Sequence, residues 1–232
     1  MQYWIENECK SCFDCAMRSP MFEFLSKKEL DLISNNKFEI KFRKGEIIRK
    51  QGTHLSHVIS VNSGLAKLYI EGYNGRNLIL RIIKSRNFIG GPGMYYDQRH
   101  HYSVIAPVDL SACFIDMNIF KQIINTNPDF AGEFMKEFSK NMLQTYDRLV
   151  SLTQKNTPGR MAEALLYLAN DIFESDRFDP HITKSDLADL TGMARDSAVK
   201  ILRDFKEDNL IKLEKGIEIL NRSALLKISE FG

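Results

Sequence analysis

Residues 183–202 read TKSDLADLTGMARDSAVKIL. The pattern predicts two short amphipathic helices joined by a tight turn at Gly192. The apolar side chains expected between the helices are Leu187, Ala188, Leu190, Ala198, Ile201 and Leu202. The opposite face of the second helix carries Arg195, Asp196, Val199 and Lys200, since residues three or four apart share one side of a helix. Such a pair is a helix-turn-helix, whose second helix enters the major groove of DNA, so gene regulation is the first functional hypothesis.

The composition is that of an ordinary folded protein. At 232 residues the chain has room for one large domain or two modest ones. Hydrophobic residues make up 44% and charged residues 27%, which excludes a disordered chain. No apolar run approaches the roughly 18–20 residues that span a bilayer, and residues 1–8 lack the basic and then apolar pattern of a secretory signal. We therefore expect a cytoplasmic protein without a membrane partner.

The charge of the C-terminal third is not that of a strongly basic domain. The whole chain has a net charge of +2. Residues 158–232 contain 11 lysines and arginines against 14 aspartates and glutamates, a net charge of −3, whereas phosphate contacts require clustered cations. The segment 193–206 is an exception, and it contains Arg195, Lys200, Arg203 and Lys206 against Asp196 and Asp204. Any DNA-binding surface is therefore expected to be local to this segment.

The region from residue 37 to residue 117 has the pattern of β-structure. It follows a cysteine-bearing leader (1–20) and a predicted helix over 26–33, in which Ser26 and Glu29 have capping-box spacing. Glycine-containing turn signals recur at Lys44–Glu46, Lys50–Gly52, Asn62–Gly64 and Asn74–Arg76. The predicted strands are Phe38–Phe42, Val58–Val61, Leu65–Ile70, Leu78–Ile83 and Tyr102–Ala106. Many short strands at this spacing predict a double-sheet roll or barrel.

After Pro128 the apolar period becomes helical. A heptad seam with 4-3 spacing contains Ala131, Met135, Phe138, Met142, Thr145, Leu149 and Leu152. A second stripe of Phe130, Phe134 and Leu143 is expected to face the roll. One helix with two apolar faces indicates a dimerisation helix packed on its own domain. The alternative is a core helix of a monomer.

The rest of the chain completes a winged unit. We expect a linker at Thr157–Gly159, a helix over 160–173, the helix-turn-helix, and a β-hairpin formed by 209–213 and 217–220. The predicted domains are therefore a leader (1–20), a roll (21–127), a dimerisation helix with its hinge (128–156) and a winged helix-turn-helix (157–232). The fold class is α+β.

This combination resembles the Crp/Fnr family of regulators. The motifs that carry the resemblance are Phe42–Glu46 with Gly52, Val61–Gly64, Gly75–Arg76, Asn87–Gly90 and the block 183–213. The resemblance implies an N-terminal double-stranded β-helix or jelly roll of the cyclic-nucleotide-binding type, a long dimerisation helix and a winged helix-turn-helix. It also implies a homodimeric transcription factor that senses an effector through the roll, binds palindromic DNA and contacts RNA polymerase.

The resemblance also indicates which residues contact DNA. Arg195, Asp196 and Lys200 match in position the residues with which the family reads its half-site. Asp196 stands where Glu is commoner, and its carboxylate is one methylene shorter; Lys200 replaces a commoner Arg and offers a point charge instead of a fork. Phosphate contacts are expected at Thr183, Lys184, Ser185 and Ser197. Val199 and Arg203 complete the predicted DNA-facing set.

The roll lacks the phosphate cassette of the cyclic-nucleotide members. Those members have a Gly-Glu pair and, about ten residues later, Arg-Ser. Here Pro92 follows Gly90 and Gly91, and His100 and His101 fall near the Arg-Ser position, with Arg99 one register away. The sequence therefore disfavours cAMP, and the effector pocket is assigned to the set Gly90, Gly91, Arg99, His100 and His101 without an identified ligand.

The cysteines suggest a different signal. Cys9, Cys12 and Cys15 form a Cys-x-x-Cys-x-x-Cys leader, and Cys113 is the only other cysteine. In the oxygen-sensing branch of the family, three leader cysteines and one distant cysteine hold a [4Fe–4S] cluster, although the third leader cysteine there is usually spaced further off. Three alternatives stay open. They are a Cys₄ zinc site, no metal at all, and a roll that binds haem or another small molecule through His100 or His101.

Two other classes of function remain to be considered. An enzyme is not expected, because the chain has no Gly-x-Ser-x-Gly, no phosphate-binding loop and no His-Glu-x-x-His motif. The second hypothesis is an effector-binding signalling module that has lost DNA reading. The net charge of −3 over residues 158–232 motivates it.

Overall fold

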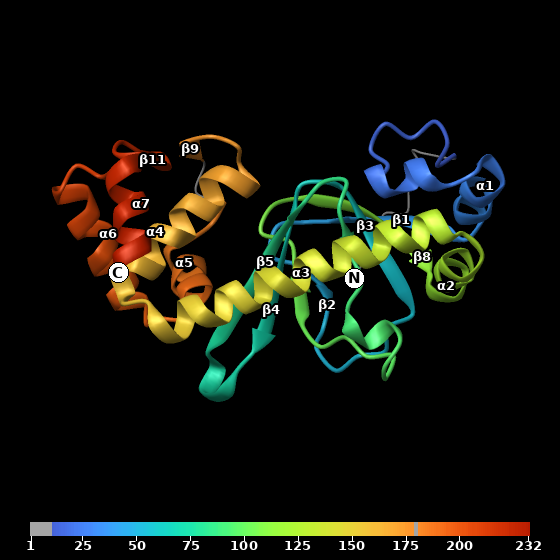
Figure 1. Ribbon diagram of the computed structural model, residues 1–232, viewed down its shortest axis with the longest axis horizontal. Coiled ribbons are helices and arrows are strands. Elements are labelled where there is room, and N and C mark those ends of the chain that lie inside the picture. The colour runs from blue at the N-terminus through green and yellow to red at the C-terminus, as the bar shows by residue number, and fades with distance from the viewer. Residues whose placement is uncertain (1–10, 179–180) are drawn as a thin grey trace. The chain divides into compact units, whose positions relative to one another are not determined.

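The computed structural model describes residues 11–178 and 181–232 (Figure 1). Two units make up the described chain. The first contains the residues up to Ile70 together with Arg81–Met142, and the second contains Glu71–Leu80 and Leu143–Gly232. No helix in the described ranges is long and apolar enough to cross a membrane.

Two four-stranded sheets form the roll that the sequence predicts. One sheet has the order β1-β8-β3-β6 and the other β2-β7-β4-β5. The pairings β1–β8, β3–β8, β2–β7 and β4–β7 are antiparallel. The strands are β1 (Lys37–Phe42), β2 (Ile47–Arg49), β3 (His57–Ser63), β4 (Leu65–Glu71), β5 (Asn77–Lys84), β6 (Phe88–Ile89), β7 (Ser103–Ile105) and β8 (Leu110–Asp116).

The predicted turns coincide with left-handed glycines. Gly45, Gly52, Gly64 and Gly75 have φ of 86°, 82°, 80° and 70°, a region that other residues rarely adopt. Gly64 meets a second constraint, because a Cβ there would collide with the carbonyl oxygen of Asp109. The turn signals in the sequence are therefore confirmed.

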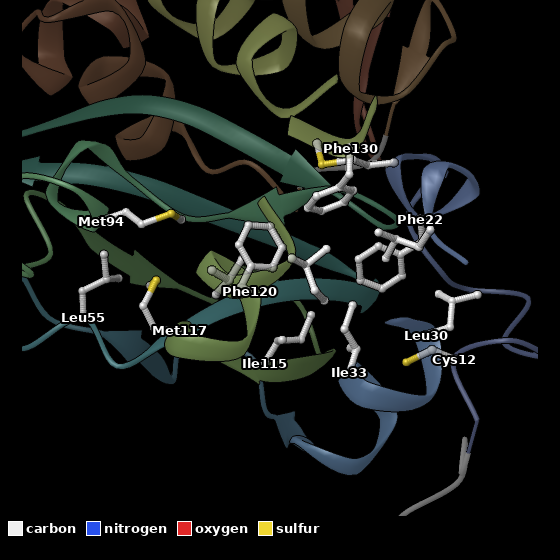
Figure 2. Close-up of a cluster of buried hydrophobic side chains, with 14 residues drawn as sticks. Cys12, Phe22, Leu30, Ile33, Leu55, Met94, Ile115, Met117, Phe120 and Phe130 are labelled. Carbon is white, nitrogen blue, oxygen red and sulfur yellow. The ribbon is translucent and has the colours of Figure 1, made fainter. Parts of the chain in front are cut away.

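A cluster of buried apolar side chains packs outside the first sheet (Figure 2). It is formed with α1 (Lys27–Asn35), α2 (Met117–Thr126) and the first turn of α3 (Pro128–Gln154). The rings of Phe120 and Phe130 meet edge to face with centroids 5.5 Å apart, and both are fully buried. Ser26 and Glu29 form the predicted capping box of α1. The sequence did not predict α2, which begins after the capping carboxylate of Asp116.

The long helix α3 agrees with the prediction in its extent and differs in one face. Phe130 is buried in the cluster and Phe134 packs against it, as expected. Leu143 was expected to share this face, and that prediction is wrong, since 61% of its surface is exposed. Nine residues separate Leu143 from Phe134, which corresponds to a rotation of about 180° around the helix. The two side chains therefore point in opposite directions.

The helix that follows α3 starts earlier than predicted. Thr157–Gly159 was expected to be a linker, and instead these residues form the first turn of α4 (Thr157–Tyr167). Asn156 caps this turn by accepting a hydrogen bond of 2.9 Å from the amide of Gly159. Proline suits this position because the first turn of a helix leaves its amides unpaired. A π-helical turn, η4 (Leu168–Ile172), continues from α4.

The remaining elements form the winged unit. They are β9 (Arg177–Phe178), α5 (Lys184–Thr191), α6 (Arg195–Glu207), β10 (Ile211–Leu213), β11 (Ile217–Ile219) and α7 (Arg222–Phe231). The strands β10 and β11 form the predicted hairpin, and β9 adds a third strand beside β11. The sequence did not predict α7, whose Leu225 is fully buried and whose start is capped by Asn221.

Candidate DNA interface, dimer face and sensor residues

The first helix of the helix-turn-helix has well-defined ends. Thr183 caps α5 by accepting a hydrogen bond of 3.1 Å from the amide of Asp186, whose carboxylate accepts in return from the Thr183 amide and hydroxyl. Gly192 ends the helix in the left-handed conformation, with φ of 62°. The positive φ favours glycine at this turn, and a Cβ at Gly192 would lie 2.9 Å from Cδ2 of Leu152, so that this side chain would have to shift.

The second helix, α6, separates into the two faces that the sequence predicts. Its buried residues are Ala198, Ile201, Leu202 and Phe205. The side chains of Arg195, Asp196, Ser197, Lys200 and Arg203 are exposed, and Val199 is half-buried beside them. A continuous polar face therefore remains free on the helix that would enter the major groove.

The beginnings of α5 and α6 differ in their capping. The hydroxyl of Thr183 is occupied by Asp186, which leaves Lys184 and Ser185 exposed at the start of α5. The N-cap residue of α6 is Ala194, which has no side chain to accept from the first amides of the helix. Unpaired amides at a helix N-terminus favour anions such as phosphate. The uncapped N-terminus of α6 can therefore contribute amides to a phosphate-binding surface, whereas the capped N-terminus of α5 contributes the exposed side chains of Lys184 and Ser185.

An apolar stripe is exposed along α3. Met135, Met142 and Leu149 have 55%, 44% and 61% of their surface exposed. Thr145 is exposed in the same seam, and Phe138 and Leu152 are half-buried. Tyr146, which lies outside the predicted seam, adds a further exposed ring four residues after Met142. Contiguous apolar surface of this kind marks an interaction site.

The C-terminal half of α3 is tied to the winged unit by polar contacts. Arg148 donates a hydrogen bond to the carbonyl of Leu190 at the end of α5, where a cation is favourable. Burial lowers the pKa of Arg148. Ser151 donates to the carboxylate of Glu163 on α4, and Nζ of Lys155 lies 3.4 Å from the same carboxylate. The part of α3 that belongs to the second unit is therefore anchored to α4 and α5.

Four of the five proposed effector residues are not enclosed by the roll. Arg99 and His101 are exposed, and Gly90 and Gly91 are half-buried. Nη1 of Arg99 donates to the carbonyl of Gly52 at 2.8 Å, and Nε2 of His101 lies 3.1 Å from the carboxylate of Asp97.

His100 is the exception. Only 2% of its surface is exposed, and neither ring nitrogen has a hydrogen-bond partner. The two adjacent histidines of the predicted pocket therefore lie in different environments, with His100 buried and His101 exposed.

Cys113 lies in a buried polar group on the outer face of the first sheet. Its Sγ is 3.2 Å from Nδ2 of Asn62 and 3.6 Å from Nζ of Lys37. The Asn62 amide also donates to the buried carboxylate of Glu39. Burial raises the pKa of Cys113, while the Asn62 hydrogen bond and the Lys37 charge act in the opposite direction and Cys12 adds to the rise.

The leader cysteines are described only in part. Cys12 is buried in the apolar cluster (Figure 2), and Cys15 is half-buried. Burial raises the pKa of Cys12, against the charge of the same Lys37 that contacts Cys113. Cys9 lies outside the described residues. Within 11–178 and 181–232, no three histidine, cysteine, aspartate or glutamate side chains are grouped as a metal site.

Two family models match the chain. Residues 39–127 match the cyclic nucleotide-binding domain, and residues 159–228 match the Crp-like helix-turn-helix domain. The two matches fall on the roll and on the winged unit. They leave unmatched α3, on which the dimer prediction rests, and the leader, which contains three of the four cysteines in the metal prediction.

Curated relatives extend over both units. The Electron transport regulator A of Shewanella oneidensis is 26% identical over 210 residues, which cover 88% of this chain and 83% of the relative. The cAMP-activated global transcriptional regulator CRP of Salmonella typhimurium is 23% identical over 175 residues, 74% of this chain and 83% of the relative. The structure of FixK2 from Bradyrhizobium japonicum aligns with a TM-score of 0.76 at 17% identity, covering 83% of this chain and 96% of that one. At that identity the last likeness is evidence of the fold alone.

Proposed function

We propose that this chain, which belongs to the Crp/Fnr family of DNA-binding transcriptional regulators, acts as a homodimer that reads a palindromic operator through α6. The observation that carries the proposal is the exposed polar face of α6, opposite a fully apolar buried face. The guanidinium of Arg195 would donate two hydrogen bonds to guanine O6 and N7, and the ammonium of Lys200 would donate to the same acceptors as a point charge. Asp196 suits the amino group of cytosine.

Contacts to the phosphate backbone would position the protein on the duplex. Lys184, Ser185 and Ser197 are exposed at the two helix N-termini, and Arg203 is exposed further along α6. Contacts to phosphate fix the orientation of a protein on DNA without reading its sequence. Because residues 158–232 have a net charge of −3, the affinity for DNA would depend strongly on these few local cations.

Dimerisation would occur through the exposed stripe on α3. A heptad seam of this length packs against a second copy as a coiled coil, and a two-fold dimer presents two copies of α6 to two half-sites. The partners proposed are therefore DNA, a second copy of the chain and, for regulation in the cytoplasm, RNA polymerase.

The test is selection of bound DNA from a random-sequence pool with the full-length protein. The proposal expects enrichment of a palindrome, with half-sites about one helical turn apart. A matched control carries Arg195→Ala, Asp196→Ala and Lys200→Ala, and it should enrich nothing. If the unaltered protein enriches no sequence under reducing or oxidising conditions, the chain is instead a signalling module that has lost DNA reading.

For the effector, we propose a redox signal through an iron–sulfur cluster held by Cys9, Cys12, Cys15 and Cys113. The support is the surroundings of Cys113, whose Sγ lies 3.2 Å from Nδ2 of Asn62 and 3.6 Å from Nζ of Lys37, together with the effect of the Lys37 charge on the pKa of the buried Cys12. Amide and ammonium donors stabilise sulfur that carries negative charge. A bound cluster would supply sensitivity to oxygen or redox state. A cyclic nucleotide is disfavoured, because Arg99 is exposed and its guanidinium is bonded to Gly52.

The cluster is tested by purifying the protein without oxygen and measuring iron, zinc, sulfide and the visible spectrum. The proposal expects a brown protein with near-stoichiometric iron. Cys113→Ser should lose the chromophore, and the control Ser111→Ala on the same strand should keep it. Colourless, iron-free protein contradicts the cluster, and stoichiometric zinc in its place supports the Cys₄ zinc alternative.

A further inference from the structure

The last turns of α3 carry a row of polar side chains beside the apolar stripe. Arg148, Ser151 and Lys155 are spaced three and four residues apart and therefore share one side of the helix. Leu149 of the heptad seam is 61% exposed, whereas Arg148 is half-buried and Ser151 is buried. One segment of helix thus presents two different surfaces.

The polar row contacts two helices of the second unit through its C-terminal members. Ser151 donates a hydrogen bond to the carboxylate of Glu163 on α4, and Nζ of Lys155 lies 3.4 Å from that carboxylate. The Lys155 ammonium also donates to the hydroxyl of Ser229 on α7 at 3.4 Å. These contacts fix the end of α3 against the body of the winged unit.

Arg148, at the start of the row, reaches the helix-turn-helix itself. Its guanidinium donates to the carbonyl of Leu190 in the last turn of α5. The last carbonyls of a helix lack partners within the helix and carry partial negative charge, which favours a cation. Leu152 makes a second contact there, because its Cδ2 would lie 2.9 Å from a Cβ at Gly192. Arg148 and Leu152 therefore hold the turn from which α6 departs.

The seam and the polar row are parts of the same short segment of helix. Thr145, Leu149 and Leu152 of the seam belong to the same unit as α5 and α6. In the proposed dimer, the seam determines where the second copy lies, and Arg148 determines where α5 ends. Together they set the distance between the two copies of α6, and hence the separation of half-sites that both copies can reach at once.

We propose that Arg148 is a positioning residue that sets the spacing between the half-sites that this protein reads. The inference rests on the proposed function, a dimer on palindromic DNA, and adds a second kind of specificity to it. The side chains of α6 select the bases within each half-site, whereas Arg148 acts through the backbone of α5 and selects the number of base pairs between them. A charged hydrogen bond suits this role because it is strong and holds only over a narrow range of distances and angles.

The experiment uses the full-length protein and the palindrome that it selects from the random-sequence pool. Gel shifts compare this operator with two sets of altered operators, one with base pairs added or removed between the half-sites and one with single bases changed inside a half-site. The unaltered protein should prefer one spacing. Arg148→Met should reduce that preference by about tenfold, the effect of one lost charged hydrogen bond, and should keep the preference at single bases.

Two further variants separate positioning from a general loss of structure. Arg148→Lys keeps a cation that can reach the same carbonyl, so it should restore most of the spacing preference. Lys140→Met is the matched control, because it removes an exposed cation from an earlier turn of α3 and should change neither preference. If Arg148→Met does not fold, Arg148→Gln takes its place; it is polar without the charge and should lose the spacing preference that Arg148→Lys retains.

The outcomes that contradict the positioning role are distinct from those that contradict the proposed function. The role is overturned if Arg148→Met keeps the full preference for one spacing, if it weakens binding to all operators alike, or if Arg148→Lys restores nothing. An unaltered protein that selects a palindrome and tolerates every spacing contradicts the positioning role alone. An unaltered protein that selects no palindrome contradicts the proposed function, and the positioning role fails with it.

Discussion

Two helices of this protein expose surfaces of opposite character. The stripe on α3 is apolar, with Met135, Met142 and Leu149 about half exposed or more. The face of α6 is polar, with Arg195 and Lys200 among its exposed residues. Both helices have the same geometry and both follow the 3.6-residue period, so the chemistry of the side chains alone distinguishes their partners.

Exposed side chains carry different information on α3 and on α6. Charged side chains are ordinarily exposed, so the exposure of α6 carries little information by itself. A row of exposed apolar side chains is unusual and indicates a surface that is covered by a partner. The informative features of α6 are instead the residue types that suit base edges and the uncapped start of the helix at Ala194.

The largest expected effect comes from breaking the apolar stripe. Leu149→Asp removes a side chain whose burial contributes about 1.5–3 kcal/mol, and two-fold symmetry doubles the loss to about 3–6 kcal/mol. Dimerisation should therefore weaken by about 100-fold or more, and operator binding should fall with it. Sedimentation velocity and gel shifts over a concentration series measure both quantities.

The control for this variant introduces the same charge elsewhere on α3. Gln144→Asp changes an exposed residue outside the heptad seam and should leave the dimer unchanged. Equal loss of dimer in both variants would mean that the charge of the helix matters and the seam does not. A fully dimeric Leu149→Asp protein would show that the seam on α3 is not the dimer interface. An unaltered protein that is monomeric would instead support the alternative of a core helix in a monomer.

A smaller effect is expected on the polar face. Lys200→Ala should cost about 1–3 kcal/mol at one base position and relax the preference there. The measurement is competition binding against operators changed one base pair at a time. The matched control, Lys206→Ala, removes an exposed lysine from the last turn of the same helix and should keep the base preference. Uniform weakening on all operators by Lys200→Ala contradicts the base-reading role.

Arg203→Ala distinguishes phosphate contacts from base contacts on the same helix. If Arg203 contacts phosphate, the variant should bind all operators more weakly to a similar extent. The slope of log affinity against log salt should fall by about 0.9 for each phosphate that is no longer neutralised, and hence by roughly 2 in a dimer. An unchanged salt slope would show that Arg203 does not bind phosphate.

The sequence predicted those elements whose signals are local. The capping box of Ser26 and Glu29, the left-handed turn at Gly192 and the wing hairpin each depend on a few adjacent residues. Strand β8 was not predicted because it is central, with β1 and β3 on either side, and its run Ala112–Ile115 is buried on both faces. Such a strand shows no alternation. The short helix α7 has too few turns to show a clear period.

For the candidate sensor residues, the sequence predicted the segment in which they lie and could not predict which of them are buried. Which of His100 and His101 faces the interior depends on how the loop before β7 pairs with residues 52–55, a long-range register that local patterns do not specify. The DNA face of α6 could be predicted because a helix with one buried side determines its exposed side.

The smallest expected effect tests the contrast between the two helix N-termini. Ala194 already has the extended backbone of a capping residue, with φ of −66° and ψ of 147°, and lacks only the hydroxyl. Ala194→Ser should therefore raise the free energy of unfolding by about 1 kcal/mol, as Thr183→Ala should lower it by a similar amount. If the free amides of α6 bind phosphate, the new hydroxyl competes for them and operator affinity should fall as stability rises. Thermal unfolding and gel shifts on the same samples measure the two quantities. Higher stability with unchanged affinity would show that the start of α6 makes no contact with DNA through its amides, and that Arg195, Asp196 and Lys200 act through their side chains alone.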